Sequence, residues 1–244
     1  MPIVLPTSKI PAEIKDPKRL IIFSKPKMGK TTALAALPNC LIVDTENGSD
    51  YVDALKVKVN SIQDINDLIK ELKNANYPYD FIALDTITML EEVCKPLALK
   101  LYQATPAGQN FTGKDVLTAP NGAGYGHLRT AVEMVIDRIA ACTKNIILIC
   151  HSKDAAIDKS ELTIKQIDLL GKTGRILSAK ADAIGYLTRD DDSNTILSFN
   201  TNDKFVECGA RPEHLRNKDV VLGEMKDNNL DFHWERIYPS LSKA

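Results

Sequence analysis

Residues 20–32 read LIIFSKPKMGKTT, and this stretch decides the fold class that the sequence predicts. An apolar run passes into a short polar loop that ends in Gly29, Lys30 and Thr31. The spacing matches the phosphate-binding loop G-x-x-x-x-G-K-T at every position except the first, where Ser24 stands in place of glycine. A strand before the loop and a helical segment after it, TTALAAL, supply the context that the motif requires. We therefore predict a nucleotide-binding loop between a strand and a helix.

Each position of this loop has an expected task. Successive backbone N–H groups and a helix amino end would surround the phosphates, Lys30 would reach the β- and γ-phosphates, and the Thr31 hydroxyl would bind Mg²⁺. Gly29 must let the backbone pass close to phosphate, whereas the first position only turns the chain off the strand, which a small serine can do. The predicted nucleotide-binding residues are Ser24, Lys25, Pro26, Lys27, Met28, Gly29, Lys30, Thr31 and Thr32.

The composition limits the kind of protein to which this loop belongs. The 244-residue chain is 44% hydrophobic and 26% charged, which is ordinary for one main globular domain. Its formal net charge of −1 gives the whole chain no strong attraction to nucleic acid or to an anionic membrane. The 5 cysteines form no C-x-x-C pair, which disfavours a disulfide framework and a zinc site and fits a reducing compartment. Since no apolar run has the length of a bilayer span and no signal-peptide pattern is present, we expect a cytoplasmic protein without a membrane partner.

Short apolar runs alternate with helical patterns along the first two-thirds of the chain. Ser61 and Asp64 resemble a helix-capping pair, and residues 126–142 carry an apolar stripe at helical spacing. Strands that alternate with helices predict an α/β fold with a mostly parallel, twisted sheet and helices on both faces. Farther on, ADAIGYLTR and NTILSFN predict paired strands around the turn DDDSN, and hence an antiparallel carboxy-terminal edge. The runs that predict parallel strands are RLIIF, CLIVD, FIALD and NIILIC.

Two long polar segments interrupt this alternation. Residues 103–126 are rich in Gly, Pro, Asn and Thr, and residues 152–172 are polar with one alternating patch. Both are longer than ordinary connections between secondary-structure elements in a compact domain, so we expect functional loops, with disordered excursions as the alternative. The predicted organisation is an amino-terminal extension over residues 1–17, a core over residues 18–215 and a carboxy-terminal extension over residues 216–244.

Acidic residues stand at the ends of two predicted strands. Asp85 ends the strand in YDFIALDT, where a carboxylate can hold Mg²⁺ as the Walker-B aspartate does, whereas Asp80 precedes that strand. Asp44 and Glu46 lie at and just past the end of the strand in CLIVDTENG. Ligands of open parallel sheets gather at the carboxyl ends of the strands, so this pair would face the phosphates, and a carboxylate two residues past a strand end has the reach to orient and deprotonate water. The alternative is a helix-capping Asp44 and a solvated Glu46. We predict that Thr31 and Asp85 bind Mg²⁺, and the choice of base between Asp44 and Glu46 is open on these grounds.

His151 follows the apolar run NIILIC, at another expected carboxyl end. A lone histidine is usually a structural polar residue, but on a central strand it would lie beside the phosphate-binding loop. It could then hydrogen-bond the γ-phosphate and report its loss, with Ser152 as the alternative. The remaining histidines, His127, His214 and His233, have no metal-ligand spacing.

The order of these motifs resembles that of the RecA-like ATPases: a phosphate-binding loop, a strand followed by Asp-x-Glu, a strand ending in Asp, and a strand ending in a polar residue. The chain looks particularly similar to the compact RecA-like single-strand annealing and recombination proteins of bacteriophages. The resemblance implies a RecA-like P-loop core in which Glu46 is the catalytic base, Asp85 the Walker-B aspartate and His151 the γ-phosphate sensor. Lys30 completes the catalytic set.

The same resemblance implies DNA binding and assembly. Its DNA-binding loops correspond to residues 103–126 and 152–172, and its basic residue that enters the ATP site of a neighbouring subunit corresponds to Lys204 or Arg211. Aromatic and basic side chains in the two segments are the expected DNA contacts: Phe111, Lys114, Tyr125, Lys153, Lys159, Lys165 and Lys172.

The expected function is therefore a Mg²⁺-dependent ATPase that uses ATP, binds single-stranded DNA and promotes annealing or strand exchange in phage recombination. It would act as a homo-oligomer, ring or filament, in the bacterial host cytosol, and a single-strand DNA-binding protein is a further expected partner. One alternative is a replication accessory ATPase, either a helicase-like motor or a loader. Another is an ATP switch that hydrolyses weakly and acts as an interaction module. A small-molecule kinase is disfavoured because no arginine-rich lid segment is evident.

Overall fold

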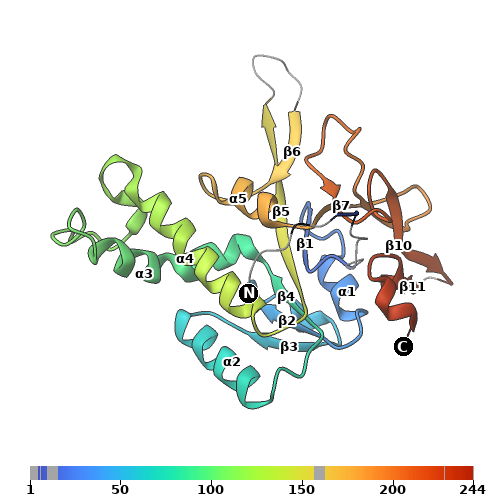
Figure 1. The fold of residues 1–244 in the computed structure, drawn as a ribbon, viewed down its shortest axis with the longest axis horizontal. Coiled ribbons are helices and arrows are strands. Elements are labelled where there is room, and N and C mark those ends of the chain that lie inside the picture. Colours follow the sequence, from blue (N-terminus) through green and yellow to red (C-terminus); the bar gives the residue numbers. More distant parts are fainter. Residues whose placement is uncertain (1–4, 6, 10–15, 157–162, 228, 244) are drawn as a thin grey trace.

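The structure, a computed structural model, describes residues 5, 7–9, 16–156, 163–227 and 229–243. It is built on an 11-stranded sheet (Figure 1). The strands are β1 (Arg19–Ser24), β2 (Cys40–Asp44), β3 (Leu55–Lys58), β4 (Phe81–Asp85), β5 (Asn145–Ala156), β6 (Thr163–Ile167), β7 (Ala183–Arg189), β8 (Thr195–Ser198), β9 (Gly209–Ala210), β10 (Asp219–Lys226) and β11 (Asn229–Phe232). Their order is β11-β10-β8-β7-β1-β5-β4-β2-β3, with β6 paired to β5 and β9 paired to β7.

The strands from β7 to β3 in this order are parallel, and β1 lies between β5 and β7. All residues of β2 and β4 are buried, as expected where both faces of a parallel sheet are covered. Alternate residues of β1 enter opposite cores: Ile21 and Phe23 pack on one face, and Leu20 and Ile22 on the other. The mostly parallel sheet with an antiparallel edge confirms the predicted α/β fold class.

Helices cover both faces of the sheet, as the sequence predicts. The α-helices are α1 (Lys30–Ala35), α2 (Ile62–Asn74), α3 (Ile87–Gln103), α4 (Ala123–Ala140) and α5 (Thr173–Lys180). Residues of α2, α3, α4 and α5 belong to one apolar core, and residues of α1 belong to the other. The α2 start is confirmed: the Ser61 hydroxyl accepts the N–H of Asp64 at 3.1 Å. Within the described residues, none of the helices combines the length and the apolar character needed to span a bilayer.

The segment 152–172 is not the loop that its polar sequence predicts. Strand β5 continues past His151 to Ala156 and pairs antiparallel with β6, so the two form a hairpin that projects beyond the sheet (Figure 1). The two strands pair from Ser152 and Ile167 onward to Thr163. This pairing satisfies the main-chain N–H and C=O groups of the segment, even though many of its side chains are polar. Residues 157–162, including Lys159, lie outside the described part of the chain.

The segment 103–126 is also more ordered than a long loop. It contains short 3₁₀ helices at Val116–Thr118 and Pro120–Gly122, and α4 begins at Ala123. Val116 is fully buried against the α3–α4 pair. Its carbonyl oxygen lies 1.8 Å from where a Cβ on Gly124 would stand, so only glycine fits that contact. The segment is therefore a packed connection between two helices.

Residues 216–244, which the sequence analysis set apart as an extension, include strands of the main sheet. β7 and β8 are antiparallel around the predicted turn, and β10 and β11 extend the sheet beyond β8. Trp234 and Tyr238 are buried in the core on the α1 face, and the indole Nε1 of Trp234 donates to the carbonyl oxygen of Ala33 at 2.8 Å. This carboxy-terminal segment thus supports the helix that begins at the phosphate-binding loop.

Candidate nucleotide site

The loop between β1 and α1 has the backbone shape of a phosphate-binding loop. Lys27 and Gly29 have positive φ angles, 65° and 92°, so N–H groups in this turn can point inward. Lys25 and Pro26 are exposed, as is Thr32 in the first turn of α1, whereas Met28 packs against the core on the α1 face. The expected nucleotide-binding residues therefore surround one short turn at the carboxyl end of β1.

Ser24, the departure from the motif, is fully buried at the end of β1 and contacts Lys30. The Lys30 ammonium lies 3.0 Å from the Ser24 hydroxyl oxygen and 3.1 Å from the carbonyl oxygen of Lys25. Burial lowers the pKa of Lys30, and the nearby carboxylates of Asp85 and Glu46 oppose that effect. Serine at this position thus supplies an acceptor for the lysine that glycine could not supply.

Thr31 and Asp85 are in direct contact. The Thr31 hydroxyl donates to the Asp85 carboxylate at 2.6 Å. Burial raises the pKa of Asp85, and the carboxylates of Asp44 and Glu46 raise it further, while Thr31 and Lys30 lower it. A cation at this point would relieve the crowding of negative charge.

The donor set at Thr31 and Asp85 fits Mg²⁺, which prefers hard oxygen ligands and usually takes only one or two carboxylates besides substrate phosphates. Among the described residues, no group of 3 or more His, Cys, Asp or Glu side chains could hold a metal by itself. The two oxygens are therefore suited to a metal that arrives with a nucleotide rather than to a resident ion.

Asp44 and Glu46, equivalent candidates in the sequence, have different environments. Asp44 is only 1% exposed, and its carboxylate accepts the N–H groups of Glu46 and Ser49, at 2.9 and 3.0 Å, and the Ser49 hydroxyl. Burial acts to raise the pKa of Asp44, but these hydrogen bonds prevail and hold it below the ordinary value. Asp44 therefore shapes the turn after β2, and its lone pairs are already occupied.

Glu46 instead lies with its side chain 41% exposed beside His151. Its Oε1 atom is 3.1 Å from the Nε2 atom of His151. His151 lies opposite Ser24 in the pairing of β1 with β5, and its backbone N–H contacts the Thr88 hydroxyl at 3.3 Å. The structure thus brings the candidate base and the candidate sensor together at the carboxyl edge of the sheet. The alternative sensor, Ser152, is the next residue along β5 and pairs with Ile167 of the hairpin.

Arg211 lies away from this site in its own chain. Arg211 follows β9, which pairs with the first residues of β7, at the end of the sheet opposite the phosphate-binding loop. Its guanidinium donates to the carbonyl oxygen of Ala179 at 2.9 Å and lies 3.6 Å from Asp182. Lys204 is exposed and precedes Phe205, whose carbonyl oxygen accepts the N–H of Lys165 in β6 at 2.8 Å.

Three residues beside the site were not found from the sequence. Arg189 lies next to Gly29 at the end of β7. Thr88 links His151 to the residues after the hairpin, because its hydroxyl donates to the Asp168 carbonyl oxygen at 3.2 Å. Glu91 is 2% exposed, and its carboxylate accepts the N–H of Leu170 at 3.0 Å. None of the three belongs to a local motif, and only the position of Arg189 after an apolar strand could have signalled it.

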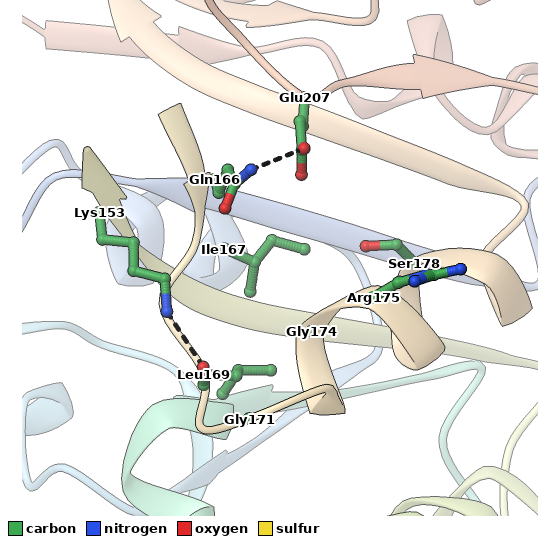
Figure 2. Close-up of a pocket in the computed structure, with 9 residues that line it drawn as sticks. All are labelled: Lys153, Gln166, Ile167, Leu169, Gly171, Gly174, Arg175, Ser178 and Glu207. Atoms are coloured by element: carbon green, nitrogen blue, oxygen red, sulfur yellow. Dashed lines mark hydrogen bonds between the residues drawn. The ribbon is translucent and has the colours of Figure 1, made fainter. Parts of the chain in front are cut away.

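A cavity of about 300 Å³ lies between the base of the hairpin and α5. Figure 2 shows Lys153 and Gln166 on the two hairpin strands and Arg175 and Ser178 on α5. Lys153 donates to the Leu169 carbonyl oxygen at 3.1 Å and lies 3.4 Å from Asp168. Arg175 has no carboxylate within 4.0 Å among the residues that the structure describes. The cavity combines cationic side chains and the amino end of a helix, which favour anions, with the carboxylate of Glu207, which accepts the Gln166 amide at 2.8 Å.

A family model described as an AAA domain matches residues 16–208. Solved structures that resemble the chain include the RadB recombinase, with a TM-score of 0.46 and 13% sequence identity over 89% of this chain and 92% of that chain. A comparison with curated proteins found no match.

Proposed function

We propose that this chain, which belongs to the AAA domain family, is a Mg²⁺-dependent ATPase that binds single-stranded DNA as a homo-oligomer and promotes annealing or strand exchange. The observation that carries the ATPase part is the meeting of three pairs at one edge of the sheet. These are Lys30 with Ser24, Thr31 with Asp85, and Glu46 with His151. Their residues come from α1, from β1, β4 and β5, and from the turn after β2, so their convergence is a property of the fold.

Each pair has a role in phosphoryl transfer. Lys30 would leave Ser24 and neutralise charge on the β- and γ-phosphates, since its three donors are free to reorient. Thr31 and Asp85 would hold Mg²⁺, which neutralises charge on those phosphates when bound. Glu46 would orient the attacking water and accept its proton, because its carboxylate is partly exposed whereas that of Asp44 is saturated.

His151 would couple the bound nucleotide to the hairpin. Its side chain touches Glu46, and its backbone N–H contacts Thr88, whose hydroxyl also reaches the residues that follow β6. The Nδ1 atom of His151 is buried and has no hydrogen-bond partner among the residues that the structure describes. A γ-phosphate that competes with Glu46 for the His151 imidazole would therefore move a residue in the strand that continues into the hairpin.

The DNA part rests on the hairpin and the cavity at its base. Lys153 and Arg175 face a space that the amino end of α5 also lines, which suits a phosphate backbone. Tyr125 is 46% exposed and lies beside Gly171, so an aromatic ring is available next to this cavity for base stacking. Few cations are present per subunit, so tight binding requires neighbouring subunits along one strand.

Assembly is also the best use for Arg211, which is exposed and lies at the end of the sheet opposite the phosphate-binding loop of its own chain, so a neighbouring subunit is where it could meet ATP. Lys204 is also exposed and is the second candidate for this role. A ring and a filament both satisfy this requirement. The resemblance to phage annealing proteins favours a role in recombination, with a single-strand DNA-binding protein as a further partner.

Fluorescence anisotropy of a labelled oligonucleotide, with and without a slowly hydrolysed ATP analogue, tests this proposal. ATP should strengthen DNA binding, and DNA should strengthen ATP binding by the same factor. Arg175→Ala should weaken DNA binding and reduce the slope of log K against log[salt] by about 0.7, the contribution of one phosphate on single strands. Arg138→Ala, on the surface of α4 where Arg138 contacts Asn66, is the matched control.

Two outcomes would contradict the DNA role. The first is a DNA affinity that does not change with nucleotide, protein concentration or oligonucleotide length. It would favour the alternative function, an ATP switch that acts as an interaction module. The second is an unchanged slope of log K against log[salt] in Arg175→Ala, which would show that the cavity is not part of the DNA-binding surface.

A further inference from the structure

We propose that Arg189 contacts the α- and β-phosphates of a nucleotide bound in its own chain, an assignment that rests on the proposed nucleotide site. Strand β7 is parallel to β1, and Phe23 pairs with Tyr186. Arg189 follows Tyr186 by the same number of residues as Pro26 follows Phe23, so it lies level with the phosphate-binding loop. A strand neighbour of β1 therefore delivers a cation to the loop.

The Arg189 guanidinium touches the loop where phosphate must approach. Its Nη2 atom lies 3.4 Å from the position that a Cβ on Gly29 would occupy. Gly29 is the residue that lets the backbone of this motif come close to phosphate, and it has a φ of 92°. A side chain that packs against this glycine is within reach of the same ligand.

The guanidinium is available for a ligand despite an acidic turn beside it. Asp190 is held by the turn itself, since its carboxylate accepts the N–H groups of Asp192 and Asn194, at 3.0 and 2.8 Å. Among the described residues, no carboxylate lies within 4.0 Å of Arg189, and its Nη1 atom has a 3.5 Å contact with the Ser193 carbonyl oxygen. Within the described part of the chain most of its donors have no partner, and their planar arrangement suits phosphate oxygens.

The side of the phosphate-binding loop on which Arg189 lies decides which phosphates it contacts. Glu46, Asp85 and His151 belong to the part of the sheet on the β5 side of β1, and the γ-phosphate must face them for water to attack. Arg189 lies on the opposite side of β1, on β7. It therefore contributes to binding of ATP and ADP alike and does not act on the transferred phosphoryl group.

Titration with fluorescent ATP and ADP tests this assignment. Arg189→Ala should weaken the binding of both ATP and ADP by about tenfold to hundredfold, the usual effect of losing a charged hydrogen bond. Arg189→Lys should recover part of the affinity, since it keeps the charge but not the planar donors. Arg138→Ala should bind as the wild type does. Melting temperatures establish that each variant is folded, and Arg189→Gln replaces Arg189→Ala if that variant does not fold.

The outcomes separate this assignment from the nucleotide site itself. A wild-type protein that binds neither nucleotide would overturn both. Wild-type binding with unchanged affinity in Arg189→Ala, or a loss restricted to ATP, would overturn the role of Arg189 alone. In mixed oligomers, the intact Arg189 of Glu46→Gln subunits should not lower the raised KM for ATP of the Arg189→Ala subunits, because Arg189 serves its own chain. A restored KM would show that Arg189 acts on a neighbouring subunit.

Discussion

Replacing the carboxylates at the end of β2 by amides, one residue at a time, should separate the residue that acts in catalysis from the residue that stabilises the turn. Glu46→Gln should keep ATP bound and cut hydrolysis by about 10²-fold or more, the usual scale for a general base. Its effect on folding should be small, because the Glu46 side chain is 41% exposed and its pair with His151 contributes about 0–1 kcal/mol. Glutamine can also keep a hydrogen bond to His151.

Asp44→Asn should act on stability instead. The new amide group would replace one carboxylate oxygen and confront the N–H of Ser49, which the native Oδ2 atom accepts at 3.0 Å. A hydrogen bond from a buried donor to a charged acceptor is worth about 1.5–3 kcal/mol. For a chain of this size that loss corresponds to a melting temperature lower by about 3–12 °C.

Thermal melting and steady-state phosphate release on the same preparations measure both effects. The expected pattern is a slow but stable Glu46→Gln variant and an unstable Asp44→Asn variant that retains turnover below its melting temperature. A stable, inactive Asp44→Asn beside an active Glu46→Gln would refute the reasoning and make Asp44 the base.

Lys30→Ala should abolish hydrolysis and weaken nucleotide binding, because Lys30 supplies the charge that faces the β- and γ-phosphates; retained phosphate release in a clean preparation would contradict this. Arg211→Ala, and to a lesser degree Lys204→Ala, should lower turnover without loss of nucleotide affinity, since a cation from a neighbouring subunit stabilises transition-state charge. Mixing Arg211→Ala with Glu46→Gln subunits should then partly restore hydrolysis, and no recovery at any ratio would favour a structural Arg211. Burial raises the pKa of Glu91 from 4.5 to about 7, so the folded state holds this proton more tightly and the free energy of unfolding should fall as pH rises between those values. Denaturant titrations should show that Glu91→Gln flattens this slope, and equal slopes in the two proteins would exclude the effect.

The parts of the fold that local sequence determines were predictable. β1, β2 and β4 are continuous apolar runs, and the phosphate-binding motif requires the strand and helix around it. β3 was missed because it is a largely exposed edge strand, LKVK, without an apolar run. The outer part of β5 was missed because the polar sequence after His151 becomes a strand only through pairing with β6.

The candidate site residues also divide into those that the sequence predicts and those that only the fold brings together. Positions fixed by motif spacing, such as Lys30, Thr31 and Asp85, could be named from the sequence. The distinction between Asp44 and Glu46 could not be drawn from residue spacing, because it depends on the path of the turn that saturates one carboxylate and exposes the other. Arg189 reaches Gly29 only because β7 and β1 are neighbours in the sheet.

The rate of ATP hydrolysis, measured with and without single-stranded DNA, tests the central claim most directly. Wild-type protein should hydrolyse ATP in the presence of Mg²⁺, and single-stranded DNA should accelerate it, because DNA promotes assembly and assembly supplies the missing cation. Lys30→Ala should hydrolyse no ATP, either with or without single-stranded DNA. Hydrolysis in the wild type that equals that of Lys30→Ala, or that does not respond to DNA of any length, would contradict a DNA-dependent ATPase.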